Sequence, residues 1–100
     1  MAATHDGHRK RMRERFRISG LEGFSEVLEL ILFYGRARGN VNDTAHALMD
    51  VFGSLPRVLE ASPEQLMLID GIGEESATLL SLILPLFRRY SDEVNQVRSK

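Results

Sequence analysis

Apolar residues recur along this chain at helical spacing, and no segment shows the sustained alternation of apolar and polar residues that marks a strand. Between residues 8 and 18, Met12 and Phe16 form one thin apolar stripe on an arginine-rich segment. Residues 26–34 are apolar on nearly every side, which is typical of a helix that is central in the fold or covered by a partner. We therefore predict an all-α fold, a compact bundle of five or six short helices.

Residues with strong capping preferences mark where these helices begin and end. Ser25 is a good N-cap for the apolar helix, and Asn42 or Asp43 can cap the next helix, which Gly53 ends. The segment Ser62-Pro63-Glu64-Gln65 holds the residues of a capping box, with proline at the first helical position. Each of these signals predicts one helix boundary.

The last helix is predicted to start after Gly73 and to end near Tyr90. Pro85 lies more than two turns inside it, so we expect a kink there or a break just before it. From Ser91 the chain is polar and is expected to fray, and residues 1–7 are expected to be a loose start.

The stretch from Leu66 to Ala77 predicts a helix, a tight glycine turn and a second helix. Gly71 and Gly73 let the backbone turn sharply, and Ile72 between them can anchor the turn to a core. The amides after the turn lie at a helix N-terminus, which can hold a phosphate. This pattern resembles a helix-hairpin-helix motif, a family in which the hairpin holds a nucleic-acid backbone without reading bases.

The flanks of the predicted hairpin leave its function open. Glu74 and Glu75 follow the turn directly, and a carboxylate repels a phosphate by about 1 kcal/mol at ~4 Å even in water. The same carboxylates suit a helix N-terminus. The hairpin therefore either holds one phosphate or caps its own helix and binds nothing. Residues 30–48 echo residues 66–84 weakly, which predicts a tandem arrangement of one degenerate and one regular hairpin.

Charge is unevenly distributed along the chain, although the net charge is only −1. Residues 1–17 carry six basic and two acidic residues, a formal charge of +4, and the remainder carries −5. A basic arm of this density either neutralises several phosphates or forms a solvated helix face. The candidate nucleic-acid-binding residues are Arg9, Lys10, Arg11, Arg13, Arg15 and Arg17 of the arm, with Gly71, Ile72 and Gly73 of the hairpin.

Several segments in consistent order resemble the N-terminal helical domain of the RadC family, whose members carry a helix-hairpin-helix front end before a JAB-type metalloprotease-like domain. The matching segments are 8–16, 19–21, 29–34, 45–48, 52–55, 58–66 and 71–90. The resemblance implies a setting in DNA repair or genome maintenance. The chain departs from the family after Tyr34, where it has Arg38-Gly39-Asn40 in place of an Arg-x-Asp.

The chain shows no recognisable catalytic or metal-binding motif. The zinc site of the family's metalloprotease-like domain uses a Glu and a His-x-His with a downstream Asp. Here the only histidines are His5, His8 and His46, and there is no cysteine. His46 is expected to be a surface or half-buried histidine. We expect no enzyme activity, no metal and no cofactor, and either an excised domain or a protein that has lost its enzyme half.

These observations predict a flexible N-terminus at 1–7, a helix-hairpin-helix domain with a basic first helix at 8–90, and a polar tail or linker at 91–100. The favoured function is sequence-independent binding of double-stranded or structured DNA through its phosphates. The alternative is a protein-interaction or dimerisation module with a purely structural hairpin, whose apolar helices dock a second subunit or an absent C-terminal domain. With no signal-peptide core and no bilayer-spanning run, we expect a cytoplasmic protein that does not contact membranes.

Overall fold

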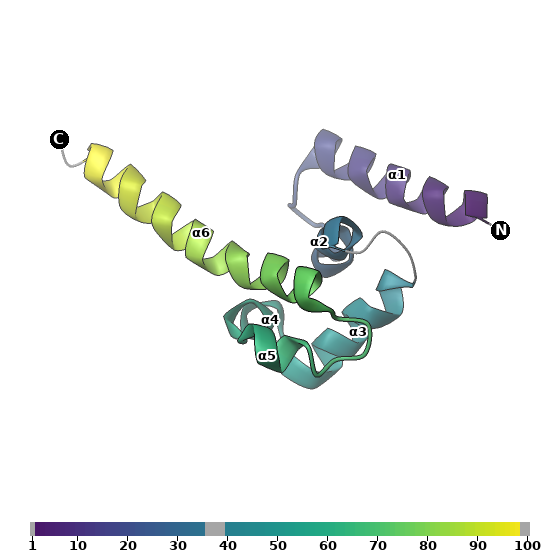
Figure 1. Ribbon diagram of the computed structural model, residues 1–100. Coiled ribbons are helices and arrows are strands. Elements are labelled where there is room, and N and C mark those ends of the chain that lie inside the picture. Colours follow the sequence, from purple (N-terminus) through teal and green to yellow (C-terminus); the bar gives the residue numbers. More distant parts are fainter. Residues whose placement is uncertain (1, 36–39, 99–100) are drawn as a thin grey trace.

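The computed structural model describes residues 2–35 and 40–98, and these residues form six helices and no strand. The helices are α1 (Ala2–Ser19), α2 (Val27–Gly35), α3 (Val41–Phe52), α4 (Leu55–Glu60), α5 (Pro63–Leu66) and α6 (Glu74–Arg98). The predicted all-α fold is confirmed (Figure 1). The turn of the predicted degenerate hairpin lies largely outside the described residues.

The core is built by the five helices that follow α1, and each contributes at least one side chain that is essentially inaccessible to solvent. The largest of these are Leu32 of α2, Leu48 of α3, Val58 of α4, Leu66 of α5 and Leu80 of α6. Full burial of one such side chain stabilises the fold by about 1.5–3 kcal/mol. Helix α2 packs against both α3 and α6, so the apolar segment predicted to be central is central.

Helix α1 is attached to the outside of α2 through a separate, smaller cluster. Its only buried apolar side chain among the residues from Gly7 onward is Met12, which packs with Phe24 and Leu30. Met12 of the predicted apolar stripe thus packs α1 on α2, and no α1 residue from Gly7 onward belongs to the main core.

The capping residues were predicted with mixed success. The capping box of Ser62 and Gln65 is present, and Gly53 ends α3 in a left-handed conformation at φ 90°. Helix α3 is capped by Asn40, whose side chain accepts from the Asp43 amide, so capping by Asn42 or Asp43 is wrong.

Ser25 is likewise not the N-cap of α2. The Glu26 carbonyl accepts from the Leu30 amide at 3.0 Å, which places Glu26 at that position. In both cases a polar residue one or two positions away competes for the same role, and propensity alone does not separate neighbours.

Both terminal helices are longer than predicted. Helix α1 begins at Ala2 rather than near His8. Helix α6 continues through Pro85 to Arg98, so it does not break before Pro85 and does not end near Tyr90. A proline removes one hydrogen bond from the ladder, and the turns on either side of it can stay helical. The domain boundaries at 8–90 and 91–100 remain predictions.

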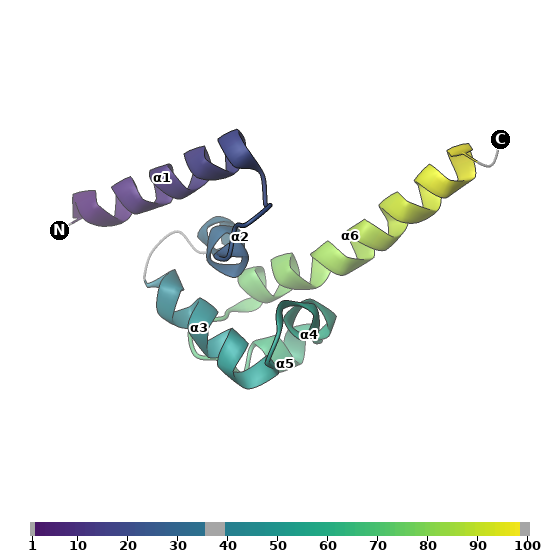
Figure 2. The same cartoon turned by 180° about the vertical axis from the view of Figure 1, so that it is seen from behind.

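The two long helices give the molecule an extended outline. The radius of gyration is 15.1 Å, whereas a compact domain of this length has about 13 Å. The second half of α6 and the N-terminal end of α1 point in opposite directions away from the body (Figures 1 and 2).

Candidate nucleic-acid interface

The glycine turn between α5 and α6 has the geometry of an anchored hairpin. Gly71 has φ 93°, a conformation that strains any residue with a Cβ. Ile72 is only 6% exposed, and its amide donates to the Ile69 carbonyl at 3.0 Å. Gly73 does not adopt a positive φ, so of the two turn glycines only Gly71 is required by backbone conformation.

The apolar residues on either side of this turn are buried where the motif predicts it. We call Leu66, Ile69, Ile72 and Ala77 the hairpin frame. Leu66 and Ala77 are fully buried, and Ile69 is buried beside Ile72 in the main core. The Gly73 carbonyl accepts from the Ala77 amide at 3.0 Å, which makes Gly73 the N-cap of α6. Leu66, Ile69, Ile72 and Ala77 therefore each have a packing role.

The electrostatics at the start of α6 are acidic. Glu74 and Glu75 are exposed in its first turn, where a carboxylate gains about 0.3–1 kcal/mol from the helix dipole. An open hollow of about 400 Å³ lies here, lined by Gly35, Gly71, Gly73, Glu74, Glu75 and Ser76. The hollow has room for a phosphate group, but the two carboxylates at its edge oppose an anion.

One wall of this hollow is a close contact between two helices that the sequence reading did not identify. The Ser76 hydroxyl donates to the Gly35 carbonyl at 3.1 Å, and Ser76 is 3% exposed. A Cβ on Gly35 would lie 2.9 Å from the Ser76 Oγ and 3.1 Å from its Cα. Small residues at both positions therefore let the end of α2 meet the start of α6. A serine one turn before Leu80 on the buried face was the available signal.

Two of the six basic candidates on α1 are used to attach the helix to the body. The Arg9 guanidinium lies 4.7 Å from the centre of the Phe33 ring, and that of Arg15 lies 4.4 Å from the centre of Phe24. Arg15 also donates to the Glu26 carboxylate at 2.5 Å. The contacts of Arg9 with Phe33 and of Arg15 with Phe24 are cation–π contacts, which contribute about 0.5–1 kcal/mol each at exposed sites.

The pKa of the Glu26 carboxyl depends on its hydrogen bond from Arg15. Burial acts to raise its pKa, but hydrogen bonds from the Arg15 side chain, from its own backbone amide and from Ser25 outweigh that effect. The pKa of Glu26 is therefore below its ordinary value of 4.5. Arg15 accordingly has a partner of its own within the chain.

The other four basic candidates are exposed on α1, and none of them forms an ion pair with the part of the chain that the structure describes. They are Lys10, Arg11, Arg13 and Arg17. Lys10, Arg13 and Arg17 follow each other at i, i+3 and i+7, so they share one face of α1, turned away from Met12. We call these three residues the basic face.

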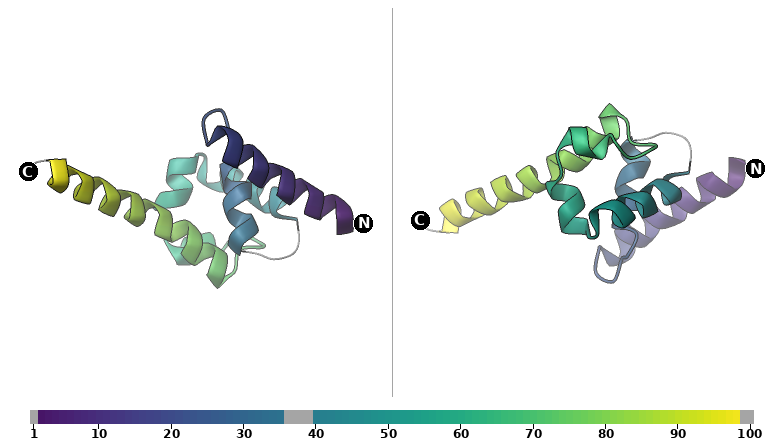
Figure 3. Two further views of the ribbon diagram at one scale, coloured as in Figure 1. Left: turned by 90° about the horizontal axis from the view of Figure 1, so that it is seen from above. Right: turned by 90° about the horizontal axis from the view of Figure 1, so that it is seen from below.

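The basic face and the hairpin are not brought together. Helix α1 packs on α2, and α2 lies between α1 and the start of α6 in the views from the side and from above (Figures 1 and 3). The predicted site residues therefore form two separate groups, not one surface.

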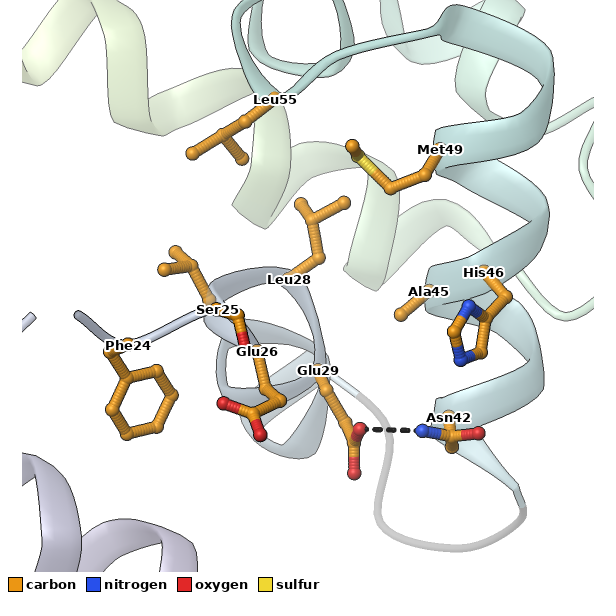
Figure 4. A pocket seen from close by; sticks show the side chains of 11 residues that line it. Phe24, Ser25, Glu26, Leu28, Glu29, Asn42, Ala45, His46, Met49 and Leu55 are labelled. Carbon is orange, nitrogen blue, oxygen red and sulfur yellow. Dashed lines mark hydrogen bonds between the residues drawn. The ribbon is translucent and has the colours of Figure 1, made fainter.

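A buried carboxylate on the predicted apolar helix joins three helices. Glu29 of α2 is 3% exposed, and its Oε2 lies 2.7 Å from Nε2 of His8 in α1. Its Oε1 accepts from Asn42 of α3 at 2.9 Å, and Figure 4 shows the two side chains pointing toward each other. Glu29 thus fixes α1 and α3 to the central helix, which is a structural role.

Beside Glu29 lies a groove of about 360 Å³ between α2 and α3. Leu28, Met49 and Leu55 line one end, while Glu29, Asn42 and His46 line the other (Figure 4). His46 is exposed, as expected. Among the described residues no group of three His, Cys, Asp or Glu side chains is arranged to hold a metal ion. None of the helices described is both long and apolar enough to cross a bilayer.

Comparison with known proteins finds relatives by sequence. A UPF0758 protein of Fusobacterium nucleatum is 42% identical over 81 residues, which cover 79% of this chain and 35% of the relative. A UPF0758 protein of Ruegeria pomeroyi is 42% identical over 78 residues, 76% of this chain and 35% of the relative. One from Idiomarina loihiensis is 36% identical over 83 residues, 81% of this chain and 37% of the relative.

No protein-family model matches the chain, and no solved structure matches it. The chain spans only about a third of the length of these relatives. Over about four fifths of its own length, this chain is therefore homologous to part of the UPF0758 proteins, the family also called RadC.

Proposed function

We propose that this chain is the N-terminal helix-hairpin-helix module of a RadC-family protein and that it binds DNA in the cytoplasm through phosphates, without catalysing a reaction. The observation that supports this proposal is the basic face of α1. Lys10, Arg13 and Arg17 are exposed, lie on one side of the helix and are turned away from the body. Side chains in this arrangement can follow consecutive phosphates of one strand and release their counterions.

The packing of α1 supports the same proposal. Arg9 and Arg15 are placed over Phe33 and Phe24, and His8 is joined to Glu29, so the helix is held in a fixed orientation. A fixed helix presents its outer charges at a constant spacing, which lowers the conformational cost of binding a regular backbone.

The hairpin has a secondary part in this proposal. The hollow beside Gly73 can accept one phosphate oxygen on the first amides of α6, but Glu74 and Glu75 oppose it. Most of the attraction therefore comes from α1, and the hairpin contributes a structural frame with at most one phosphate contact.

The test is a salt titration of binding to a short labelled duplex of arbitrary sequence. Each phosphate contact contributes about 0.9 to the slope of log K against log salt concentration. Replacing Lys10, Arg13 and Arg17 together by serine is expected to weaken binding and to lower the slope by about 3. Arg57→Ser removes an equal charge per site from an exposed position of α4 and is the matched control. Absence of duplex binding at low salt, or an equal loss per charge in the control, would refute the proposal.

A second candidate function, protein interaction, is favoured by a different observation. The second half of α6 exposes large apolar side chains, with Leu86 61% and Phe87 62% accessible. Isolated exposed apolar residues are ordinary, but several on one helix face indicate a contact surface.

A further inference from the structure

The second half of α6 carries a regular apolar stripe away from the body of the domain. Its members are Ile83, Phe87, Tyr90, Val94 and Val97, which follow one another at alternating intervals of four and three residues. This is the spacing of a coiled-coil seam. Phe87, Tyr90 and Val97 are 62%, 64% and 74% exposed. We call these five residues the α6 stripe.

The same spacing continues backwards into the domain core. Ser76 and Leu80 precede Ile83 at intervals of four and three residues, and they are 3% and 0% exposed. One helix face is thus covered by the body in its first half and by no described helix in its second half (Figures 1 and 2). The uncovered half has the pattern that packs against a helix in the covered half.

The stripe has large side chains toward one end and small ones toward the other. After Ile83 at its start, the aromatic Phe87 and Tyr90 come next along the helix, and Val94 and Val97 follow. An open hollow of about 380 Å³ lies on the helix where the side chains become smaller, lined by Tyr90, Glu93, Val94, Val97 and Arg98. The stripe therefore has aromatic side chains that project and, beside the valines, a space that can receive an aromatic ring.

These features are complementary to a second copy of the same helix running in the opposite direction. In an antiparallel pair centred on Asp92, Phe87 of each copy faces Val97 of the other, and Tyr90 faces Val94. A large side chain then packs on a small one in each of the layers that these four residues form, which keeps the spacing between the helices even. A parallel pair would instead place ring against ring.

The position of the body also selects the antiparallel direction. The body covers the stripe face over the first half of α6, so two parallel copies would bring both bodies into the space between the helices. In an antiparallel pair each body lies beyond the C-terminal end of the other helix. We propose that two copies of this chain associate through the α6 stripe as an antiparallel, two-fold symmetric pair. This proposal does not depend on DNA binding.

The association is tested by sedimentation of the full chain over a range of concentrations. The stripe is short, so we expect a monomer–dimer midpoint between about 1 μM and 1 mM. Val94→Glu places a carboxylate in the seam and is expected to weaken the dimer by about 30-fold or more. Gln96→Glu adds the same charge on an exposed position outside the stripe and is expected to change the midpoint by less than about twofold.

Circular dichroism of both variants checks that helicity is kept, since neither position belongs to the domain core. A chain that stays monomeric at about 1 mM overturns the proposal. So does a dimer that Val94→Glu and Gln96→Glu weaken equally. A monomer that binds an unrelated protein through the stripe also overturns it, because the occupant would then not be a second copy.

The direction of the pair is tested with spin labels on single introduced cysteines, since the chain contains none of its own. In the proposed pair the two labels at Ser91→Cys lie near the two-fold axis, and those at Leu82→Cys are separated by about 30 Å along the helices. A parallel pair would give similar distances at the two positions. Equal distances would therefore refute the antiparallel arrangement.

Discussion

The hairpin and the basic arm were both identified from local sequence patterns, yet their residues have different roles in the structure. In the hairpin, Ile69, Ile72 and Ala77 are buried and Gly71 has the conformation that only glycine adopts easily. In the arm, Arg9 and Arg15 are used for packing, while Lys10, Arg11, Arg13 and Arg17 are exposed. A motif can thus be fully explained by folding, and the exposed remainder is where function is to be sought.

The difference has a direct consequence for mutagenesis. Substitutions in the hairpin frame are expected to change stability, because those residues lie in the main core. Substitutions on the basic face are expected to change binding and to leave stability within about 0.5 kcal/mol. If substitutions in the hairpin changed only binding, or substitutions on the basic face changed mainly stability, these assigned roles would be wrong.

The largest effect is expected from Ile72→Ala. Ile72 is 6% exposed and packs in the main core, so truncation leaves a cavity beneath the turn. We expect a loss of about 2–5 kcal/mol in the free energy of unfolding, measured by urea denaturation. Leu68→Ala, in the same loop at 84% exposure, is the matched control and should cost less than about 0.5 kcal/mol. Equal losses would show that the hairpin is not anchored through Ile72.

A smaller effect is expected from the two turn glycines, which differ in conformation. Gly71→Ala forces a Cβ into φ 93° and should cost about 1–2 kcal/mol. Gly73→Ala meets no atom within 4 Å. It loses a preferred N-cap residue but reduces the freedom of the unfolded chain, so the net change should be within about 0.5 kcal/mol.

Thermal unfolding of the two glycine variants side by side measures this difference. A Gly73→Ala variant as unstable as Gly71→Ala would mean that both glycines are needed by the backbone. In that case the turn would be tighter than the observed dihedral angles indicate.

Much of this fold could be predicted because its signals are local. The Ser62 capping box, the Gly53 stop and the frame of the hairpin each depend on residues within a few positions of one another. The spacing of apolar residues and the preferences of capping residues predict such segments well. The start of α1 was predicted poorly because residues 2–7 show no apolar periodicity. The end of α6 was missed for another reason, since Val94 and Val97 continue the spacing of Phe87 and Tyr90 among residues that are otherwise polar.

The contacts that could not be predicted from the sequence join residues that are far apart along the chain. Glu29 binds His8 and Asn42 across 21 and 13 positions, and Ser76 binds Gly35 across 41. Nothing in the local pattern distinguishes Glu29 from a solvated glutamate. The position of Ser76 one turn before Leu80 indicates burial but does not identify Gly35 as its partner. The separation of the arm from the hairpin is also a tertiary property, so the candidate residues could be found but not assembled into a site.

The smallest effect concerns the attachment of the arm and depends on pH. The pKa of Glu26 is held below its ordinary value of 4.5 by hydrogen bonds that include one from Arg15. The stabilisation that the charged carboxylate gives is therefore complete above pH 4.5 and is lost as pH falls through the lowered pKa of the folded state. Because the Glu26 side chain is 37% exposed, we expect the charged carboxylate to contribute only about 0.2–1 kcal/mol to stability.

The pKa of Glu26, followed by NMR, is a sharper measurement of this attachment than stability. Arg15→Gln should raise the Glu26 pKa, whereas Arg13→Gln, two positions away on the exposed side of α1, should leave it unchanged. An equal response to both variants would mean that the general charge of the arm, and not its specific packing on α2, sets the Glu26 pKa.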